Sequence, residues 1–440
     1  MRIFSSLNRE QQEAIGLLQI GTFLEYFDLM LYVHMAVLLN ELFFPKTDPH
    51  TAALLTAFAF CCTYVLRPFG ALLFGYLGDN MGRKTTVIIT TMMMAVSCIV
   101  MANLPTYAQI GIGATWVVTV CRIVQGLSSM GEIIGAQIYV SEITKPPSGY
   151  VYVSFVSLAS AVGGMAALGV ATLSTRHGFD WRIAFWIGAG IAMIGSVART
   201  RLRETPEFLE MKNKIKVAKK NRVKVHHDKI YYPTLIAYFL IQCGWPLSFF
   251  LGFFYFNSTL KQVFGYSAED IILHNFCLTA VPVFQGIALA IMSYYINPLT
   301  ILRIKGYLFT VLMIFIAALI NTCTSANHIF VLQALILVLC LNDFPAQYIF
   351  IKQMPVHRRF TASGFIYASS RALTYIITSF GIVYLTEIFG HWGLLFITIP
   401  LCTSYLLSIN YFEKLENQKH HQVHTPHPFS ANPDEIKLAR

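Results

Sequence analysis

Residues 75–84 read Gly-Tyr-Leu-Gly-Asp-Asn-Met-Gly-Arg-Lys, a charged, glycine-rich segment between two long apolar stretches. Its three glycines favour a tight reversal of the backbone, and its two basic residues favour a loop that stays in the cytoplasm. Asp79 is then free to face the positive end of a neighbouring helix. The pattern predicts a gating loop between two membrane spans, made of Gly75, Gly78, Asp79, Gly82, Arg83 and Lys84.

The composition is that of a protein that crosses a membrane many times. Of the 440 residues, 55% are hydrophobic and only 12% are charged, with a mean hydropathy of +0.57, whereas soluble domains carry about 25% charged residues. The net charge of +10 does not indicate nucleic-acid binding, because nearly all Lys and Arg outside the predicted spans fall on one side of the membrane. Those predicted on the other side are Lys46, Arg176, Arg182 and Lys261.

The nine cysteines are scattered through apolar segments without the spacing of metal ligands. We therefore expect neither a disulfide framework nor a metal site. The chain also shows no pairing of a nucleophile with a base, so an enzyme is not predicted, and no cofactor is expected.

Apolar stretches of about 20 residues mark helical membrane spans, and twelve can be counted. An even number of spans returns both termini to the same side, where the basic loops also lie, so both termini are predicted to be cytoplasmic. The predicted spans are 15–40, 53–76, 85–103, 110–139, 150–173, 182–198, 232–257, 271–296, 304–322, 328–351, 361–386 and 392–412.

A basic interval divides these spans into two sets of six. The predicted organisation is an N-terminal six-helix bundle (1–198), a basic cytoplasmic linker (199–231), a C-terminal six-helix bundle (232–412) and a polar cytoplasmic tail (413–440). Two such repeats place a binding site at the membrane midplane between them. The second repeat lacks a full copy of the gating loop, because residues 293–306 keep only its basic end, Arg303 and Lys305.

Ionisable side chains at membrane depth are expensive and mark functional sites. A rise of about 1.5 Å per residue places several of them well inside their spans: Glu25, Asp28, Arg67, Arg122, Asp343 and Arg371. Glu25 and Asp28 are three residues apart and share a helix face, where two carboxylates favour binding of one proton. Gln125 and Glu132 lie on one stripe of the fourth span, and Glu132 could serve an inner gate or relay. Each charge could instead form a static ion pair, such as Arg67 with Asp28.

Several motifs resemble one transporter family. The first is residues 21–32, Gly-Thr-Phe-Leu-Glu-Tyr-Phe-Asp-Leu-Met-Leu-Tyr, followed in order by residues 66–70, the 75–84 segment, residues 122–132, 180–183 and 202–208. The chain thereby resembles the metabolite:proton symporter family of the major facilitator superfamily, which includes proline/betaine, α-ketoglutarate, citrate and shikimate transporters. The resemblance implies an all-α integral membrane protein with twelve transmembrane helices in two pseudo-symmetric six-helix bundles, the major facilitator fold.

The resemblance implies import of a small organic solute with protons by alternating access, in a bacterial inner membrane and as a monomer. Arginines suit a carboxylate, and carboxylates with aromatic residues suit a quaternary ammonium, so a zwitterion of the proline/betaine type is predicted. An α-ketoglutarate or other carboxylate symporter is the alternative, followed by a drug-efflux antiporter and a non-transporting membrane sensor. The predicted substrate and proton site comprises Glu25, Asp28, Arg67, Arg122, Gln125, Glu132 and Arg371.

Overall fold

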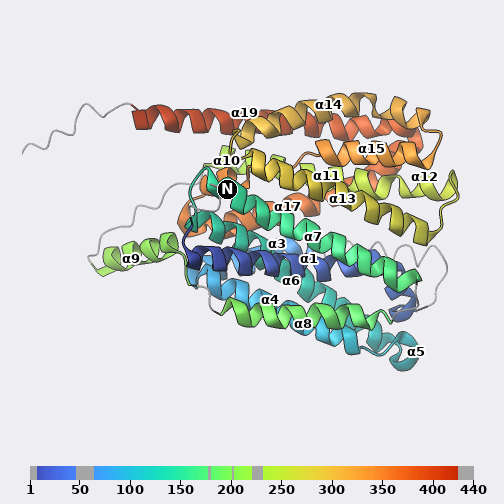
Figure 1. Ribbon diagram of the computed structural model, residues 1–440, viewed down its shortest axis with the longest axis horizontal. Helices are drawn as coiled ribbons and strands as arrows, with labels where there is room; N and C mark the ends of the chain where they lie inside the picture. The colour runs from blue at the N-terminus through green and yellow to red at the C-terminus, as the bar shows by residue number, and fades with distance from the viewer. Residues whose placement is uncertain (1–6, 46–63, 177–179, 201–202, 221–230, 425–440) are drawn as a thin grey trace, which may run out of the picture.

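The computed structural model describes residues 7–45, 64–176, 180–200, 203–220 and 231–424. All regular elements in these ranges are helical, and the long helices run roughly parallel to one another (Figure 1). Eight of the helices formed by the described residues are long and apolar enough to cross a membrane. They account for most of the twelve predicted spans, and part of the predicted second span, 53–76, lies outside the described residues.

The first half of the chain forms one bundle, which lies in the lower part of Figure 1. Its helices start and end at turn residues that interrupt the apolar runs, such as Pro68 at the first turn of α3 and Gly111 before α6. The helices are α1 (Arg9–Phe43), α3 (Arg67–Asn80), α4 (Arg83–Asn103), α5 (Tyr107–Ile110), α6 (Ile112–Ile143), α7 (Ser148–Arg176) and α8 (Arg182–Arg199).

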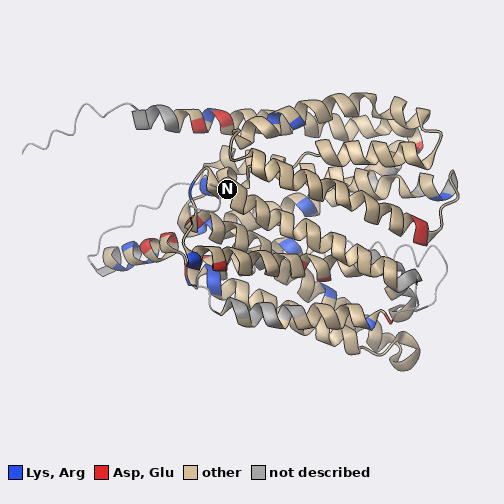
Figure 2. Ribbon diagram, viewed as in Figure 1, with Lys and Arg blue, Asp and Glu red and all other residues tan. Residues whose placement is uncertain are grey.

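The predicted linker contains a helix of its own, α9 (Pro206–Lys220), which stands at one end of the bundle (Figure 1). Charged residues gather at this end, whereas only isolated charges lie along the bundle (Figure 2). We call it the α9 end of the molecule. The opposite end carries α5.

The second half forms the bundle in the upper part of Figure 1. Its helices are shorter and more often interrupted than those of the first half. They are α10 (Tyr232–Gln242), α11 (Gly244–Phe250), η2 (Leu251–Tyr255), α12 (Asn257–Gln262), α13 (Ala268–Met292), α14 (Pro298–Thr322), α15 (Ala326–Leu339), α16 (Gln347–Lys352), η3 (Val356–Arg358), α17 (Arg359–Ile376), η4 (Ile377–Ile382), α18 (Val383–Phe389), η5 (Gly390–Leu394) and α19 (Leu395–His424).

One predicted helix boundary is corrected here: the predicted span 328–351 is broken between α15 and α16. The predicted span 232–257 lies in one apolar helical stretch, Tyr232–Lys261, which is subdivided into α10, α11, η2 and α12. Residues 413–424 of the predicted polar tail continue α19 as a helix. A run of apolar residues does not reveal such interruptions, because tertiary contacts can satisfy the freed backbone groups.

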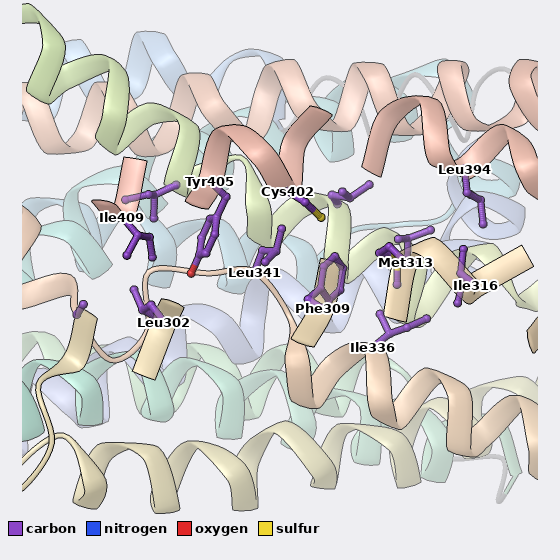
Figure 3. Packing of buried hydrophobic residues seen from close by; sticks show 14 of the residues in the cluster. Leu302, Phe309, Met313, Ile316, Ile336, Leu341, Leu394, Cys402, Tyr405 and Ile409 are labelled. Atoms are coloured by element: carbon purple, nitrogen blue, oxygen red, sulfur yellow. The ribbon is translucent and has the colours of Figure 1, made fainter. Parts of the chain in front are cut away.

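Each half has its own hydrophobic core, and the halves meet along two pairs of helices. The larger core lies in the second half, where α14, α15 and α19 bring Leu302, Phe309, Ile336 and Tyr405 together (Figure 3). Between the halves, α7 packs against α13 and α3 packs against α17. The space left between these two contacts contains the site described next.

Candidate functional site

A cavity of about 190 Å³ lies between the two halves. It is smaller than the roughly 300–1,000 Å³ typical of sites for drug-sized ligands, so it suits a small metabolite. The first half contributes residues of α1, α6 and α7, and the second half contributes residues of α11, η2, α13, α14, α16, α17 and the break between α15 and α16. The polar and aromatic lining residues include Tyr26, Gln137, Ser157, Trp245, Phe249, Gln285, Lys305, Asn342, Asp343, Gln347, Tyr367, Arg371 and Tyr375.

Arg371 and Asp343 are joined in the cavity wall by a glutamine. The Arg371 Nη1 donates to Gln242 Oε1 at 3.2 Å, and the Gln242 Nε2 donates to Asp343 Oδ2 at 2.8 Å. The Arg371 guanidinium also stacks 3.3 Å from the centre of the Tyr367 ring. The predicted site residue Arg371 therefore lines the cavity. The neutral side chain of Gln242 links its guanidinium to the carboxylate of Asp343.

Polar groups from the two halves meet across the cavity. The hydroxyls of Tyr26 and Tyr367 are 2.6 Å apart. Ser157 of α7 accepts hydrogen bonds from Gln137 of its own half at 2.9 Å and from Gln347 of the other half at 3.1 Å. These contacts show that the two bundles touch at the cavity, so a change in their relative position must alter the lining.

Asp28, another predicted site residue, is buried within the first half and does not line this cavity. Its side chain is fully shielded, and no N–H or O–H donor of the described residues reaches either carboxylate oxygen. The thiol of Cys98 lies beside the carboxylate. A Cβ atom added at Gly188 of α8 would lie only 2.0 Å from Asp28 Oδ1, so the glycine makes room for the acid.

Arg122 and Gln125 belong to the same buried region. The Arg122 Nη1 donates to Gln125 Oε1 at 3.1 Å, and Gln125 Nε2 lies 3.7 Å from the Cys98 sulfur. Together with Asp28 they form a polar chain through α6, α4 and α1. The structure thus groups three predicted site residues, but it places them inside one bundle and away from the lining of the central cavity.

The remaining predicted site residues have different positions. Glu25 is buried on α1 but does not line the cavity. Arg67 is buried with its guanidinium 4.3 Å from the centre of the Tyr64 ring, which packs against the cavity residue Tyr375. The alternative pairing of Arg67 with Asp28 is not found among the described ion pairs. Glu132 lies in α6, but its side chain is outside the described residues.

The prediction of a ten-residue turn over 75–84 is wrong. Gly75 and Gly78 lie inside α3, and the chain reverses only at Met81 and Gly82. A Cβ at Gly75 would lie 2.7 Å from the Cα of Thr361, and one at Gly78 would lie 2.4 Å from the Phe360 ring. These two glycines therefore permit close packing of α3 on α17, and do not make the turn.

Of the three glycines in this segment, Gly82 alone has the backbone conformation that favours glycine, with φ at +121°. The residue also leaves space for Glu204, whose carboxylate accepts hydrogen bonds from the backbone N–H of Arg83 at 3.1 Å and of Lys84 at 3.4 Å. This carboxylate compensates the positive end of α4. Lys84 contributes to the segment through its backbone.

Asp79 binds the first turn of α17, as the sequence predicted for an acid facing the positive end of a helix. Its carboxylate accepts hydrogen bonds from the backbone N–H groups of Phe360 at 3.1 Å and Thr361 at 2.9 Å, and from the Thr361 hydroxyl at 2.7 Å. Arg83 lies 3.4 Å away on the other side of the carboxylate. Asp79 therefore joins the first half to the second at the α9 end.

Further ion pairs extend this connection, and we call the whole group the α9-end lock. Arg359 donates to Glu142 at 2.9 Å and to Glu207 at 2.7 Å, while Arg83 donates to the Val356 carbonyl at 2.9 Å. Burial opposes ionisation of Glu207, but hydrogen bonds from Lys352 and Arg359 hold its pKa below the usual range. The lock comprises Asp79, Arg83, Glu142, Glu207, Lys352 and Arg359.

Sequence reasoning missed several residues of the site. Gln242 has no distinguishing sequence pattern, and Lys305 resembles the basic end of the gating loop, whereas the structure places Lys305 as the eighth residue of α14 with its side chain buried and lining the cavity. The depth of Asp343 in its predicted span marks it as a buried charge, but no sequence pattern indicates that Gln242 is its partner. A lysine seven residues after the start of an apolar helix is the sequence feature that could have indicated a buried charge. Its access to the cavity depends on the break between α15 and α16, which the sequence does not reveal.

Comparisons with known proteins agree with this architecture. Residues 17–235 match the family described as "Sugar (and other) transporter". The chain is 31% identical over 280 residues to a putative metabolite transport protein of Haemophilus influenzae, covering 61% of this chain and 60% of that protein. It is 29% identical over 276 residues to the proline/betaine transporter of Escherichia coli, covering 60% of this chain and 55% of that protein. The chain thus spans less than two thirds of the length of these relatives.

Solved structures show the same fold over nearly the whole chain. The proton:xylose symporter XylE of the major facilitator superfamily, bound to 6-bromo-6-deoxy-D-glucose, superposes with a TM-score of 0.74 at 14% identity, covering 92% of this chain and 95% of that one. The human organic anion transporter MFSD10 superposes with a TM-score of 0.65 at 14% identity, covering 92% and 100%. At this identity the likeness establishes the arrangement of helices.

Proposed function

We propose that this chain belongs to the major facilitator superfamily and imports a small zwitterionic organic solute together with protons; the matching family model and the shared fold support this assignment. The sequence relatives are bacterial transporters and not enzymes. The proposal places the chain as a monomer in a bacterial inner membrane, with the basic α9 end and both termini in the cytoplasm. It requires no cofactor other than the coupling proton.

The observation that carries the proposal is the mixed charge of a small cavity. Arg371 and Asp343 hold opposite charges within one wall, and aromatic rings from Trp245, Phe249 and Tyr375 supply the faces that attract a quaternary or secondary ammonium. A ligand with one carboxylate and one cationic nitrogen matches both features. A purely cationic or neutral solute would leave the basic groups of the lining without a partner.

Asp28 is the proposed proton carrier. Its carboxylate is fully buried and is approached by a thiol, which is a weak donor. An ionised carboxylate in such surroundings is costly, whereas the protonated form is tolerated. Binding a proton here therefore lowers the free-energy cost of a conformation in which this part of the bundle is closed to water.

In this proposal, the α9-end lock closes the cytoplasmic side of the protein. With the first turn of α17 bonded to Asp79, and Arg359 bonded to Glu142, the cytoplasmic ends of the two halves are held together. Solute and proton would then enter from the opposite side. Release into the cell requires these contacts to separate, which is the conformational step of alternating access.

A dicarboxylate of the α-ketoglutarate type is the second candidate. The specific observation in its favour is that the described lining carries two basic residues, Lys305 and Arg371, and one acidic residue, Asp343. One carboxylate neutralises this excess. A second carboxylate would require a proton on Asp343, so a dicarboxylate would be carried with at least one additional proton.

Uptake into proteoliposomes tests the proposal. Labelled proline, glycine betaine and α-ketoglutarate are offered separately, with and without an inward proton gradient. We expect gradient-driven accumulation of proline or betaine. Accumulation of α-ketoglutarate alone would select the second candidate, and counterflow without accumulation would remove the proton-carrier role of Asp28. Binding without any flux would indicate a membrane sensor.

A further inference from the structure

Lys305 reaches the cavity from a helix that lies on the outside of its bundle. Its helix, α14, packs against α15 and α19, yet the Lys305 side chain is buried and lines the cavity. The ammonium enters through the break between α15 and α16, where it lies 3.4 Å from Asn342 Oδ1 and 3.9 Å from the Cys340 sulfur. The break between α15 and α16 thus gives the Lys305 ammonium, on the neighbouring helix α14, access to the cavity.

The break does not need Lys305 to satisfy its backbone. The N–H of Leu341 donates to the hydroxyl of Ser248 at 3.1 Å, and the carbonyl of Asn342 accepts from the hydroxyl of Tyr405 at 2.6 Å. Leu341 and Tyr405 are also packed in the hydrophobic core of this half (Figure 3). The irregular segment is therefore fixed by neighbouring helices, and the lysine contributes an additional positive charge.

That charge is poorly compensated by the surrounding protein groups. A lysine ammonium carries three donors, and its two described contacts are a long bond to a neutral amide oxygen and a weaker one to a thiol. Lys305 has no ion-pair partner among the residues that the structure describes. Burial of a cation with such partners is unfavourable unless an anion completes the site.

Arg371 is less available to an incoming anion. Its Nη1 already donates to Gln242 Oε1 at 3.2 Å and to the Tyr367 carbonyl at 3.3 Å, and its guanidinium plane is stacked on the Tyr367 ring. The nearby Asp343 supplies a countercharge through Gln242. Arg371 keeps N–H groups on Nη2 and Nε, but its charge already has a countercharge in Asp343 through Gln242, whereas Lys305 has none among the residues that the structure describes.

We propose that Lys305 is the carboxylate-binding residue of the cavity and makes a carboxylate obligatory in the ligand. This inference rests on the proposed import of a small charged solute through the same cavity and specifies how it is selected. Arg371 and Asp343 then serve to position the cationic part of a zwitterion against the aromatic residues. Choline, which has a quaternary ammonium and no carboxylate, is excluded.

Binding to the purified full-length protein tests the assignment, with glycine betaine, choline and α-ketoglutarate as probes. We expect the wild type to bind betaine and not choline. Lys305→Met should weaken betaine binding by about ten- to a hundredfold, the range expected for a hydrogen bond to a charged group. Lys305→Arg, which keeps the charge, should recover part of the affinity. Arg303→Gln is the matched control, because Arg303 lies on the same helix but pairs with Glu413 at 2.9 Å outside the cavity.

A second readout separates ligand binding from a structural role. A buried cation without a countercharge does not stabilise the fold. The melting temperature of Lys305→Met, measured without ligand, should therefore be no lower than that of the wild type. A lower melting temperature, failure of this variant to fold, or unchanged betaine affinity would overturn the assignment. Choline binding as tight as betaine binding would also overturn it.

The test remains decisive if the proposed zwitterion is wrong. Should the wild type bind α-ketoglutarate and not betaine, the zwitterion proposal fails, while the Lys305 assignment is still judged by the loss of α-ketoglutarate affinity in Lys305→Met. Should none of the three probes bind, the ligand-free melting temperatures decide: equal or higher stability of Lys305→Met supports an unneutralised cation, and lower stability overturns it.

Discussion

The two halves of this protein each contain an arginine and an aspartate with a glutamine between them, but the two arrangements differ. In the second half, Arg371, Gln242 and Asp343 form a continuous chain of hydrogen bonds that opens onto the cavity. In the first half, Arg122 and Gln125 are bonded, and Cys98 lies between the glutamine and Asp28.

This difference suits the two halves to two different tasks, ligand contact and proton binding. A continuous chain keeps opposite charges compensated beside a ligand, so it can stay ionised while solute enters and leaves. Among the described residues, the Asp28 carboxylate is approached by a thiol and packs closely on the backbone at Gly188, so it is poorly compensated and its charge depends on a proton. We therefore assign ligand contact to the second half and proton binding to the first.

The largest effect is expected from Asp28→Asn. The amide resembles the protonated acid in shape and cannot lose a proton, so gradient-driven accumulation should fall to background while exchange of solute across the membrane persists. The measurement is uptake with a proton gradient compared with counterflow without one, in the same proteoliposomes.

Asp343→Asn is the matched variant in the other half. Removing the acid leaves the Arg371 charge without its countercharge, so solute affinity should weaken by about ten- to a hundredfold, and residual transport should still respond to the gradient. If Asp28→Asn lost affinity and Asp343→Asn lost coupling, the assignment of tasks to the halves would be reversed.

Asp79→Asn tests the lock that joins the halves. The charge that faces the first turn of α17 is lost, at a cost of about 1–2 kcal/mol in the closed conformation. Transport should fall about tenfold while size-exclusion chromatography shows a folded protein. Asn80→Ala is the control, because the side chain of Asn80 donates to the Tyr76 carbonyl on its own helix and has no bond to the other half among the described residues; equal activity of the two variants would remove Asp79 from the gate.

Gly188→Ala tests the space that accommodates Asp28. The new Cβ would lie 2.0 Å from Asp28 Oδ1, so the acid or α8 must move, and the stability should fall by about 1–3 kcal/mol. Thermal melting in detergent measures the loss. At Gly190, two residues along, a Cβ would meet nothing within 4 Å, and Gly190→Ala should melt like the wild type. A melting temperature of Gly188→Ala equal to that of Gly190→Ala would contradict the close approach.

The smallest effect concerns Glu207 at the α9 end. Its pKa is lowered from 4.5 by hydrogen bonds from Lys352 and Arg359, in spite of partial burial. A lowered pKa of an acid means that its contribution to stability is complete above about pH 4.5 and is lost as the pH falls through the lowered value. Because the side chain is partly exposed, Glu207→Gln should lower stability by at most about 1 kcal/mol at neutral pH. The melting temperatures of the two proteins should converge in acid; a gap that widened in acid would refute the sign.

Much of the architecture could be read from the chain because the membrane imposes a simple rule. Apolar runs of about 20 residues have to form helices in order to satisfy their backbone in lipid, and the basic 199–231 interval marks the division between bundles. The same logic located Asp28, Arg122 and Arg371 as buried charges. It also anticipated that Asp79 faces a helix start, since an acid between basic residues at a loop needs such a partner.

Other features could not be read because they depend on contacts between distant segments. Gly75 and Gly78 looked like turn residues, and only the approach of α17 shows that they allow helix packing. Arg122 and Arg371 looked equivalent by depth, yet one is enclosed in its bundle and the other lines the cavity.

The sequence by itself determined that this protein is a two-bundle membrane protein with charges at the midplane, because hydropathy and the cost of buried charge are local properties of the chain. The tertiary structure decided which charges meet a ligand. Lys305 shows why: its access to the cavity depends on a break in a neighbouring helix, and such a break is stabilised by hydrogen bonds from other helices that no local pattern records.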